Sequence, residues 1–132
     1  MRKRELERFE RLLGEERERL QQQHDELEES ARRSLRDSSG DLSAYAFHMA
    51  DLGTDAMERE QNLMLAASIT RTLADIADAL HRIRNGDYGI CDSCHRPVDV
   101  KRLQALPHAR MCLACQEALD HGRNSSSGAA HP

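Results

Sequence analysis

The sequence has few of the residues that fill a large core. It contains no tryptophan, and aromatic residues occupy only 3% of its 132 positions. Charged residues make up 32%, above the roughly 25% that is average for globular proteins. A chain with so little bulky apolar volume favours long surface helices over a compact globule.

Long apolar runs are also absent. The amino-terminal stretch MRKRELERFE lacks the apolar segment of a secretory signal. No run approaches the roughly 18 apolar residues that span a bilayer. These absences predict a soluble, cytoplasmic protein with no membrane contact.

Excess positive charge is missing as well. The formal net charge is −4, whereas a general nucleic-acid-binding protein is usually basic. Residues 89–123 carry nearly balanced charges and no Phe, Tyr or Trp on which a base could stack. The composition therefore disfavours direct binding of DNA or RNA, although it does not exclude a local basic patch.

Residues 3–36 predict one long helix. Leu6, Leu13, Leu20 and Leu27 recur every seven residues, which is typical of a coiled-coil seam. The polar run DSSG that follows predicts the end of this helix.

Residues 55–84 predict a second helix, with Thr54 as its N-cap and Asn85-Gly86 as its end. Its apolar residues step by three and four positions, as in the other half of a coiled-coil seam: Ala66, Ile69, Leu73, Ile76, Leu80 and Ile83. Two such helices of similar length pack most simply as an antiparallel hairpin. We expect this hairpin to span residues 1–85, with its tip at about residues 38–57.

The expected tip contains the stretch ADLGTDA, residues 50–56. Asp51 could form an Asx-turn, and Asp55 could simply favour the start of a helix. Alternatively, the two carboxylates could form the functional site of the protein. The residues alone leave both interpretations open.

Four cysteines form two Cys-x-x-Cys pairs with seventeen residues between them: Cys91, Cys94, Cys112 and Cys115. This spacing is typical of a four-cysteine zinc site. A tetrahedral ion needs two such pairs facing each other, and Gly89 suits a close turn before the first pair. Because four protein ligands leave no open coordination position, we expect one structural Zn²⁺ rather than a catalytic one.

The predicted zinc finger covers residues 86–122 and ends in a short helix that begins at the second cysteine pair and stops at Gly122. The small, polar residues 123–132 predict a disordered tail. The expected fold class is therefore mainly α. It consists of a long antiparallel two-helix coiled-coil hairpin and a small four-cysteine zinc-finger module with a short C-terminal helix.

A coiled-coil hairpin followed by YGICDSC, a VKRLQALP segment and MCLACQ resembles the DksA/TraR family of four-cysteine zinc-finger proteins. The resemblance extends to about residue 121 and is most specific in the zinc module. It implies a non-enzymatic bacterial transcription regulator that binds RNA polymerase. In this family the coiled coil enters the secondary channel, and its tip alters open-complex stability, often together with ppGpp. The resemblance requires no sequence-specific DNA contact, and we expect a monomer.

The tip of this chain departs from the family pattern. The best-known members carry Asp-x-x-Asp-x-Ala, whereas this chain has Asp51-x-x-x-Asp55-Ala56. By resemblance, these three residues are the candidates for contact with the polymerase.

A second departure concerns ppGpp. Responsive members have an Arg directly before the Pro of the zinc module, where this chain has Leu106. Other basic residues lie nearby in the sequence and could replace it: Arg82, Arg84, Lys101 and Arg102. The nucleotide therefore stays an open candidate ligand.

Two other functions remain open on the sequence. One is a zinc ribbon that binds nucleic acid directly, and the other is a coiled-coil scaffold stapled by zinc. An enzyme is not expected, because a two-helix hairpin offers no pocket that holds a substrate and excludes water.

Overall fold

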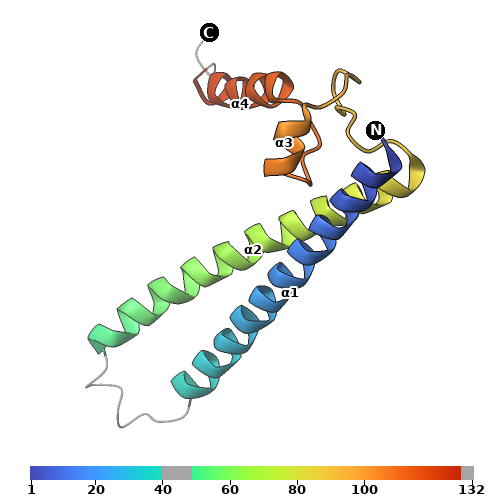
Figure 1. The fold of residues 1–132 in the computed structure, drawn as a ribbon. Helices are drawn as coiled ribbons and strands as arrows, with labels where there is room; N and C mark the ends of the chain where they lie inside the picture. The colour runs from blue at the N-terminus through green and yellow to red at the C-terminus, as the bar shows by residue number, and fades with distance from the viewer. Residues whose placement is uncertain (40–48, 129–132) are drawn as a thin grey trace. The chain divides into compact units, whose positions relative to one another are not determined.

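The computed structural model describes the backbone of residues 1–39 and 49–128 and the side chains of residues 1–33 and 56–122. These residues form four helices: α1 (Lys3–Ser39), α2 (Met49–Asn85), α3 (Val100–Ala105) and α4 (Leu113–Gly128) (Figure 1). The β-structure in the described part of the chain is one isolated antiparallel bridge between Ile90 and Pro97. The mainly helical fold, with two long contacting helices and a four-cysteine cluster, is confirmed.

The chain divides into two compact units, and both long helices run through both of them. One unit contains Met1–Glu15 together with Asp75–Pro132, and the other contains Glu16–Ala74. The start of α1 thus groups with the end of α2. The two helices therefore run antiparallel, as the apolar pattern predicts.

The unit that holds the cysteines has a small core. Its fully or nearly buried apolar residues are Phe9, Leu13, Ile76, Ala79, Leu80, Tyr88, Cys91, Val98 and Leu103. The rings of Phe9 and Tyr88 lie 5.5 Å apart between centroids, so α1 packs directly against the segment before the first cysteine. Such a tilted ring pair adds about 0.5–1.5 kcal/mol beyond the area that it buries.

The expected coiled-coil seam is confirmed wherever side chains are described. Along α1, Leu13 is fully buried and Leu6, Leu20 and Leu27 are half-buried. All six predicted seam positions of α2, from Ala66 to Ile83, are buried or half-buried. The step of three and four residues places these side chains on one face of each helix, which is why the two helices bury them against each other.

Helix α2 begins at Met49, which is earlier than the apolar pattern predicts. Thr54 therefore lies inside the helix, and the prediction that it is the N-cap is wrong. A glycine inside a helix costs about 1 kcal/mol relative to alanine, so Gly53 does not end the helix by itself. Asp51 and Asp55 both belong to α2, and their side chains lie outside the described part of the structure.

The prediction that the last helix stops at Gly122 is wrong, because α4 continues to Gly128. A glycine ends a helix by adopting a positive φ, and Gly122 does not have one. Gly86, by contrast, has a φ of 81° directly after the last residue of α2, as predicted. Of the expected tail, residues 129–132 lie outside the described residues.

Helix α3 has no counterpart in the sequence prediction. Asp99 caps it by accepting a hydrogen bond from the backbone nitrogen of Lys101 at 3.2 Å. Leu103 anchors it through a side chain that is fully buried. A helix of six residues is too short to show an apolar period in the sequence, so its cap and its one buried residue give little signal.

None of the helices, as far as they are described, combines the length and the apolar composition that crossing a membrane requires.

Candidate metal centre

The first cysteine pair lies in a tight turn. The backbone nitrogen of Cys91 donates to the carbonyl of Arg96 at 2.9 Å, and that of His95 donates to the carbonyl of Cys91 at 3.0 Å. His95 has a φ of 59°, in the left-handed region that such a turn uses and that His tolerates better than most residues. The turn folds the chain back on itself and brings the sulfur of the exposed Cys94 within 4.8 Å of the sulfur of the buried Cys91.

Gly89 allows the chain to approach the core closely just before this turn. Its φ is 85°, and a Cβ at this position would lie 2.9 Å from Met1 Cε and 3.6 Å from Leu103 Cδ1. Its carbonyl accepts a hydrogen bond from Val98 at 2.7 Å, which closes the loop around the first pair. The expectation of a close turn at Gly89 is confirmed.

The second cysteine pair lies at the start of α4. The carbonyl of Cys112 accepts the first helical hydrogen bond, from the nitrogen of Gln116 at 2.9 Å, and Cys115 lies in the first turn. Residues three apart lie on the same face of a helix, so both thiols point the same way.

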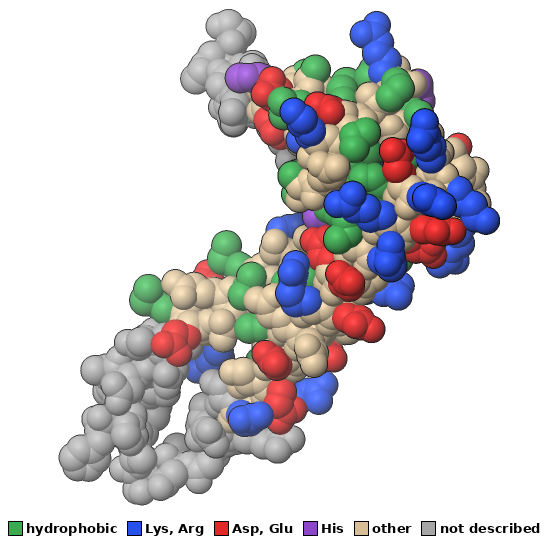
Figure 2. Space-filling model, viewed as in Figure 1, with side chains coloured by type: hydrophobic (Ala, Val, Ile, Leu, Met, Phe, Trp, Pro, Cys, Tyr) green, Lys and Arg blue, Asp and Glu red, His purple; other side chains and the backbone are tan. Residues whose placement is uncertain are grey.

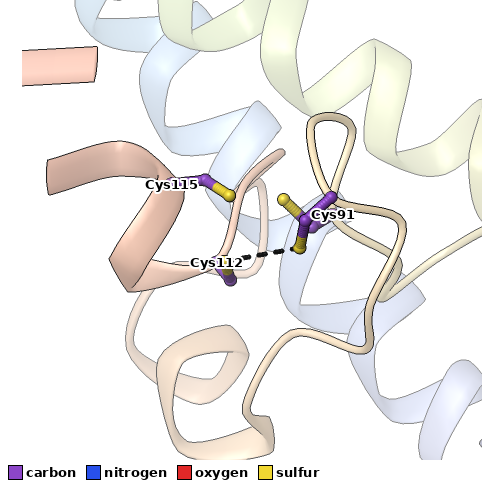
Figure 3. A group of neighbouring side chains, drawn as sticks. Cys91, Cys112 and Cys115 are labelled. Carbon is purple, nitrogen blue, oxygen red and sulfur yellow. Dashed lines mark hydrogen bonds between the residues drawn. The ribbon is translucent and has the colours of Figure 1, made fainter. Parts of the chain in front are cut away.

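The four thiols converge on one point. All four sulfurs lie within 4.8 Å of one another, and the sulfurs of Cys94 and Cys112 are 3.9 Å apart. Figure 3 shows the side chains of Cys91, Cys112 and Cys115 close together. A tetrahedral zinc ion with Zn–S bonds of about 2.3 Å needs sulfurs about 3.8 Å apart. The thiols form no disulfide, so all four are available as ligands. The cluster therefore fits one structural zinc ion.

Without a metal, the thiols differ in acidity. The backbone N–H groups of Cys94 and Cys112 lower the pKa of Cys91 to about 6. Hydrogen bonds with the neighbouring sulfurs of Cys112 and Cys91 raise the pKa of Cys115 to about 12. Zinc binds thiolates, so loading this cluster displaces protons from it.

The basic residues expected near the junction do not all remain free. Arg82 is buried and lies 3.0 Å from Asp78, between Nε and Oδ2. Arg102 donates from Nε to the carbonyl of Met111 at 3.0 Å. Arg84 and Lys101 are exposed. Two of the four candidate nucleotide contacts are thus engaged with the protein itself.

Arg110 forms ion pairs with three aspartates beside the metal centre, and this cluster was not predicted from the sequence. Two of them, Asp75 and Asp78, lie on α2. Their spacing shows only that they share a helix face. Nothing in the sequence indicates that Arg110 packs against that face, because this pairing depends on how the module folds.

Comparison with known proteins identifies the family that this fold and metal centre define. The model of the prokaryotic dksA/traR C4-type zinc finger matches residues 86–121. An uncharacterised protein of Aquifex aeolicus (strain VF5) is 31% identical over 120 residues, which cover 91% of this chain and 79% of the relative. The chain belongs to the DksA/TraR C4-type zinc-finger family.

Two relatives carry names that describe a function. The RNA polymerase-binding transcription factor DksA of Caulobacter vibrioides (strain NA1000 / CB15N) is 30% identical over 69 residues, covering 52% of this chain and 49% of the relative. The solved structure of the transcription factor DksA2 from Pseudomonas aeruginosa matches with a TM-score of 0.76 at 27% identity. That match covers 94% of this chain and 89% of the other. Membership in a family of transcription factors agrees with the expectation that the chain is not an enzyme.

The match to other curated relatives is partial. It spans 30% and 52% of the lengths of two Bacillus subtilis (strain 168) proteins.

Proposed function

We propose that this chain is a transcription regulator that binds bacterial RNA polymerase, inserts the tip of its two-helix hairpin into the secondary channel and so modulates open-complex stability. One observation carries the proposal. The likeness to the transcription factor DksA2 extends over 94% of the chain, and so includes the long helices as well as the zinc finger. A zinc finger alone could serve many functions, because one fold can host many activities. The match to DksA2 also includes the hairpin, which is the element that the proposed mode of action uses.

The metal centre supports a non-catalytic role for the zinc module. Four thiolates fill the tetrahedral shell of zinc, so no position is left for a substrate or a reactive water. The module then serves to hold its loops and α4 against the base of the hairpin. Any effect on the polymerase has to come from surfaces rather than from chemistry at the metal.

The surface of α2 supports a docking role for the hairpin. Met57, Leu63 and Met64 are 63%, 65% and 67% exposed, although apolar side chains of this size are usually buried. Hydrophobic side chains are visible on this part of α2 in the space-filling view (Figure 2). Large exposed apolar patches mark surfaces that bind other proteins.

A groove of about 550 Å³ lies in the same unit, between residues 27–31 of α1 and 56–66 of α2. Leu27, Ala31 and Leu63 form part of its apolar lining, and Glu28 and Glu60 add acidic groups. A groove with an apolar lining and acidic groups is suited to a partner surface that carries both apolar and polar side chains.

We assign contact with the polymerase to Asp51, Asp55 and Ala56. Ala56 is exposed, and it lines the groove. Positions 51 and 55 are four residues apart in α2, so they stand one turn above each other on the helix. The sequence alone allowed Asp51 in a turn and Asp55 at the start of a helix. Both positions instead belong to α2, where they are neighbours on successive turns.

The test compares the wild type with the double variant Asp51→Asn/Asp55→Asn, in binding to purified RNA polymerase and in open-complex lifetime on a ribosomal promoter. Glu7→Gln/Glu10→Gln is the matched control, because it removes two exposed negative charges from the other end of the hairpin. We expect the tip variant to bind but to leave the lifetime unchanged, and the control to behave as the wild type. Repeating the assay with ppGpp tests the nucleotide.

A wild-type chain that does not bind the polymerase would overturn the proposal. The scaffold and nucleic-acid functions would then be tested by the mass in solution and by binding of bare DNA. A tip variant that still changes the lifetime as the wild type does would retain the polymerase as partner and exclude the two aspartates as the effector residues.

A further inference from the structure

A cluster of charged side chains joins the zinc module to α2. We call it the Arg110 cluster, and it consists of Asp75, Asp78, Arg82, Asp92 and Arg110. All five residues belong to the same compact unit as the four cysteines. The cluster lies outside the thiolate shell, and the zinc chemistry described above does not use it.

Within the cluster, Arg110 bridges the two cysteine turns. Its carbonyl accepts a hydrogen bond from the backbone nitrogen of Asp92 at 3.0 Å. Its Nε donates to Asp92 Oδ2 at 3.2 Å. Asp92 directly follows Cys91, and Arg110 lies two residues before Cys112. These two hydrogen bonds therefore link the halves of the metal centre beside their ligands.

Two aspartates of α2 form ion pairs with the same guanidinium. Arg110 Nε lies 3.5 Å from Asp78 Oδ2, and Arg110 Nη1 lies 3.8 Å from Asp75 Oδ1. Asp75 and Asp78 are three residues apart, so they present their carboxylates on one face of the helix. A single exposed ion pair contributes little to folding stability. Here three carboxylates surround one guanidinium, and such a network can contribute more.

Arg82 closes the cluster into a ring of alternating charges. Its Nε lies 3.0 Å from Asp78 Oδ2, and its Nη1 lies 3.7 Å from Asp92 Oδ1. The Arg82 side chain is only 11% exposed. Asp78 Oδ2 and Arg82 Nε are both buried and have no hydrogen-bond partner, so the contact between them is an ion pair without hydrogen-bond geometry. A buried carboxylate oxygen needs a cation beside it, so Asp78 depends on both arginines. The ring thus couples α2 to both cysteine turns.

We propose that Asp75 and Asp78 are positioning residues for the zinc site, and that zinc affinity depends on these two carboxylates of α2 acting through Arg110. The aspartates precede the first cysteine by thirteen residues or more in the sequence, yet they fix the residue that holds the two thiol pairs together. Coupling of this kind is reciprocal, so zinc in turn strengthens the attachment of the module to α2. Substitution of groups beyond the metal ligands typically lowers metal affinity by about 10- to 100-fold.

The first experiment measures zinc affinity of the full chain by competition with a chromogenic chelator. Asp78→Asn is expected to weaken zinc binding by about 10-fold, and Asp75→Asn by about 3-fold, because the pair of Asp75 with Arg110 is longer. Asp87→Asn is the matched control. Asp87 is exposed, makes no ion pair among the described residues and lies closer in sequence to Cys91, so a general loss of negative charge would act at least as strongly there. We expect its affinity to stay within about 2-fold of the wild type.

A double-mutant cycle tests the route through Arg110. If Asp78 acts through the guanidinium, then Asp78→Asn combined with Arg110→Gln weakens zinc binding no more than Arg110→Gln alone. The absorption spectrum of the cobalt(II)-loaded protein shows whether each variant still binds its metal through four thiolates in tetrahedral geometry. If Asp78→Asn loses its helical circular dichroism, Asp75→Asn is compared with Asp87→Asn in its place. The Asp75 side chain is 40% exposed, so removing its charge leaves no buried atom unpaired.

Zinc affinities of Asp75→Asn and Asp78→Asn that equal the affinity of Asp87→Asn would overturn the proposal. A lower thermal stability together with this result would mean that the cluster supports only the fold. Additive effects in the double-mutant cycle would also overturn it, because Asp78 and Arg110 would then act on the metal centre independently.

Discussion

The hydroxyl of Tyr88 donates a hydrogen bond to the carbonyl of Pro107 at 2.8 Å, in a buried place and between residues nineteen positions apart. This bond joins the segment that leads into the first cysteine turn to the loop that follows α3. The same ring packs on Phe9 of α1. Tyr88 thus connects three parts of the small core that surrounds the metal centre.

Tyr88→Phe is expected to lower the free energy of unfolding of the zinc-loaded protein by about 1–3 kcal/mol, because the buried carbonyl of Pro107 loses its donor. The ring itself remains, so the contact with Phe9 should be retained. Urea denaturation followed by circular dichroism measures the change. An unchanged midpoint would mean that water replaces the hydroxyl without cost.

The pH dependence of stability follows from the same side chain. Burial raises the pKa of Tyr88 to about 12, above its ordinary value of 10.0 in the unfolded chain. Between pH 10 and 12, the Tyr88 hydroxyl therefore stays protonated in the folded state while it ionises in the unfolded chain. The contribution of Tyr88 is fully present below pH 10 and is lost as the pH rises toward 12.

This expectation is measured by denaturation of the wild type and Tyr88→Phe at several alkaline pH values, with tyrosinate absorbance as a second signal. The wild type should lose more stability than the variant between pH 10 and 12. Equal losses in the two proteins would show that other groups cause the alkaline transition.

Removal of zinc should unfold the module more than the hairpin. The cysteine turns and α3 bury few side chains, whereas the long helices share a seam that does not involve the metal. Structural zinc sites contribute about 10–16 kcal/mol of apparent binding free energy, which is large beside the stability of a small domain.

We therefore expect a strong chelator, or the substitution Cys112→Ser, to abolish the dispersed amide signals of residues 86–122 in nuclear magnetic resonance spectra. The helical circular dichroism of the two long helices should be largely retained. A chain that loses all of its helical signal on chelation would show that the hairpin depends on zinc.

The long helices and the metal ligands could be predicted because their signals lie within short stretches of sequence. A repeat of apolar residues decides which face of each helix is buried, as Leu13 and Ile76 show. The spacing of two residues within each cysteine pair is a direct consequence of the geometry of one ion. Neither inference needs knowledge of how distant segments pack.

The features that sequence reasoning missed depend on such packing or on weak local preferences. The start of α2 at Met49 depends on whether Gly53 is tolerated within a helix, which costs only about 1 kcal/mol. The contact of Arg110 with Asp78 depends on the path of the chain between the cysteine pairs. The residue types in these segments predict neither the start of α2 nor the contact between Arg110 and Asp78.

Two glycines offer a pair of substitutions with opposite expected signs. Gly89→Ala should lower the free energy of unfolding by about 1–2 kcal/mol, because φ is 85° and the new Cβ would lie 2.9 Å from Met1 Cε. The flexible end of Met1 can move aside, so the backbone conformation accounts for most of this cost.

Gly14→Ala should raise the free energy of unfolding by about 0.5–1 kcal/mol. Gly14 lies inside α1, and nothing is within 4 Å of the position that the new Cβ would occupy. Alanine has a higher helix propensity than glycine and loses less backbone entropy on folding. Chemical denaturation of both zinc-loaded variants beside the wild type measures the two effects. Stabilisation by Gly89→Ala would show that the turn before Cys91 does not need its left-handed backbone, and destabilisation by Gly14→Ala would show that α1 packs more tightly at this position than its open surroundings indicate.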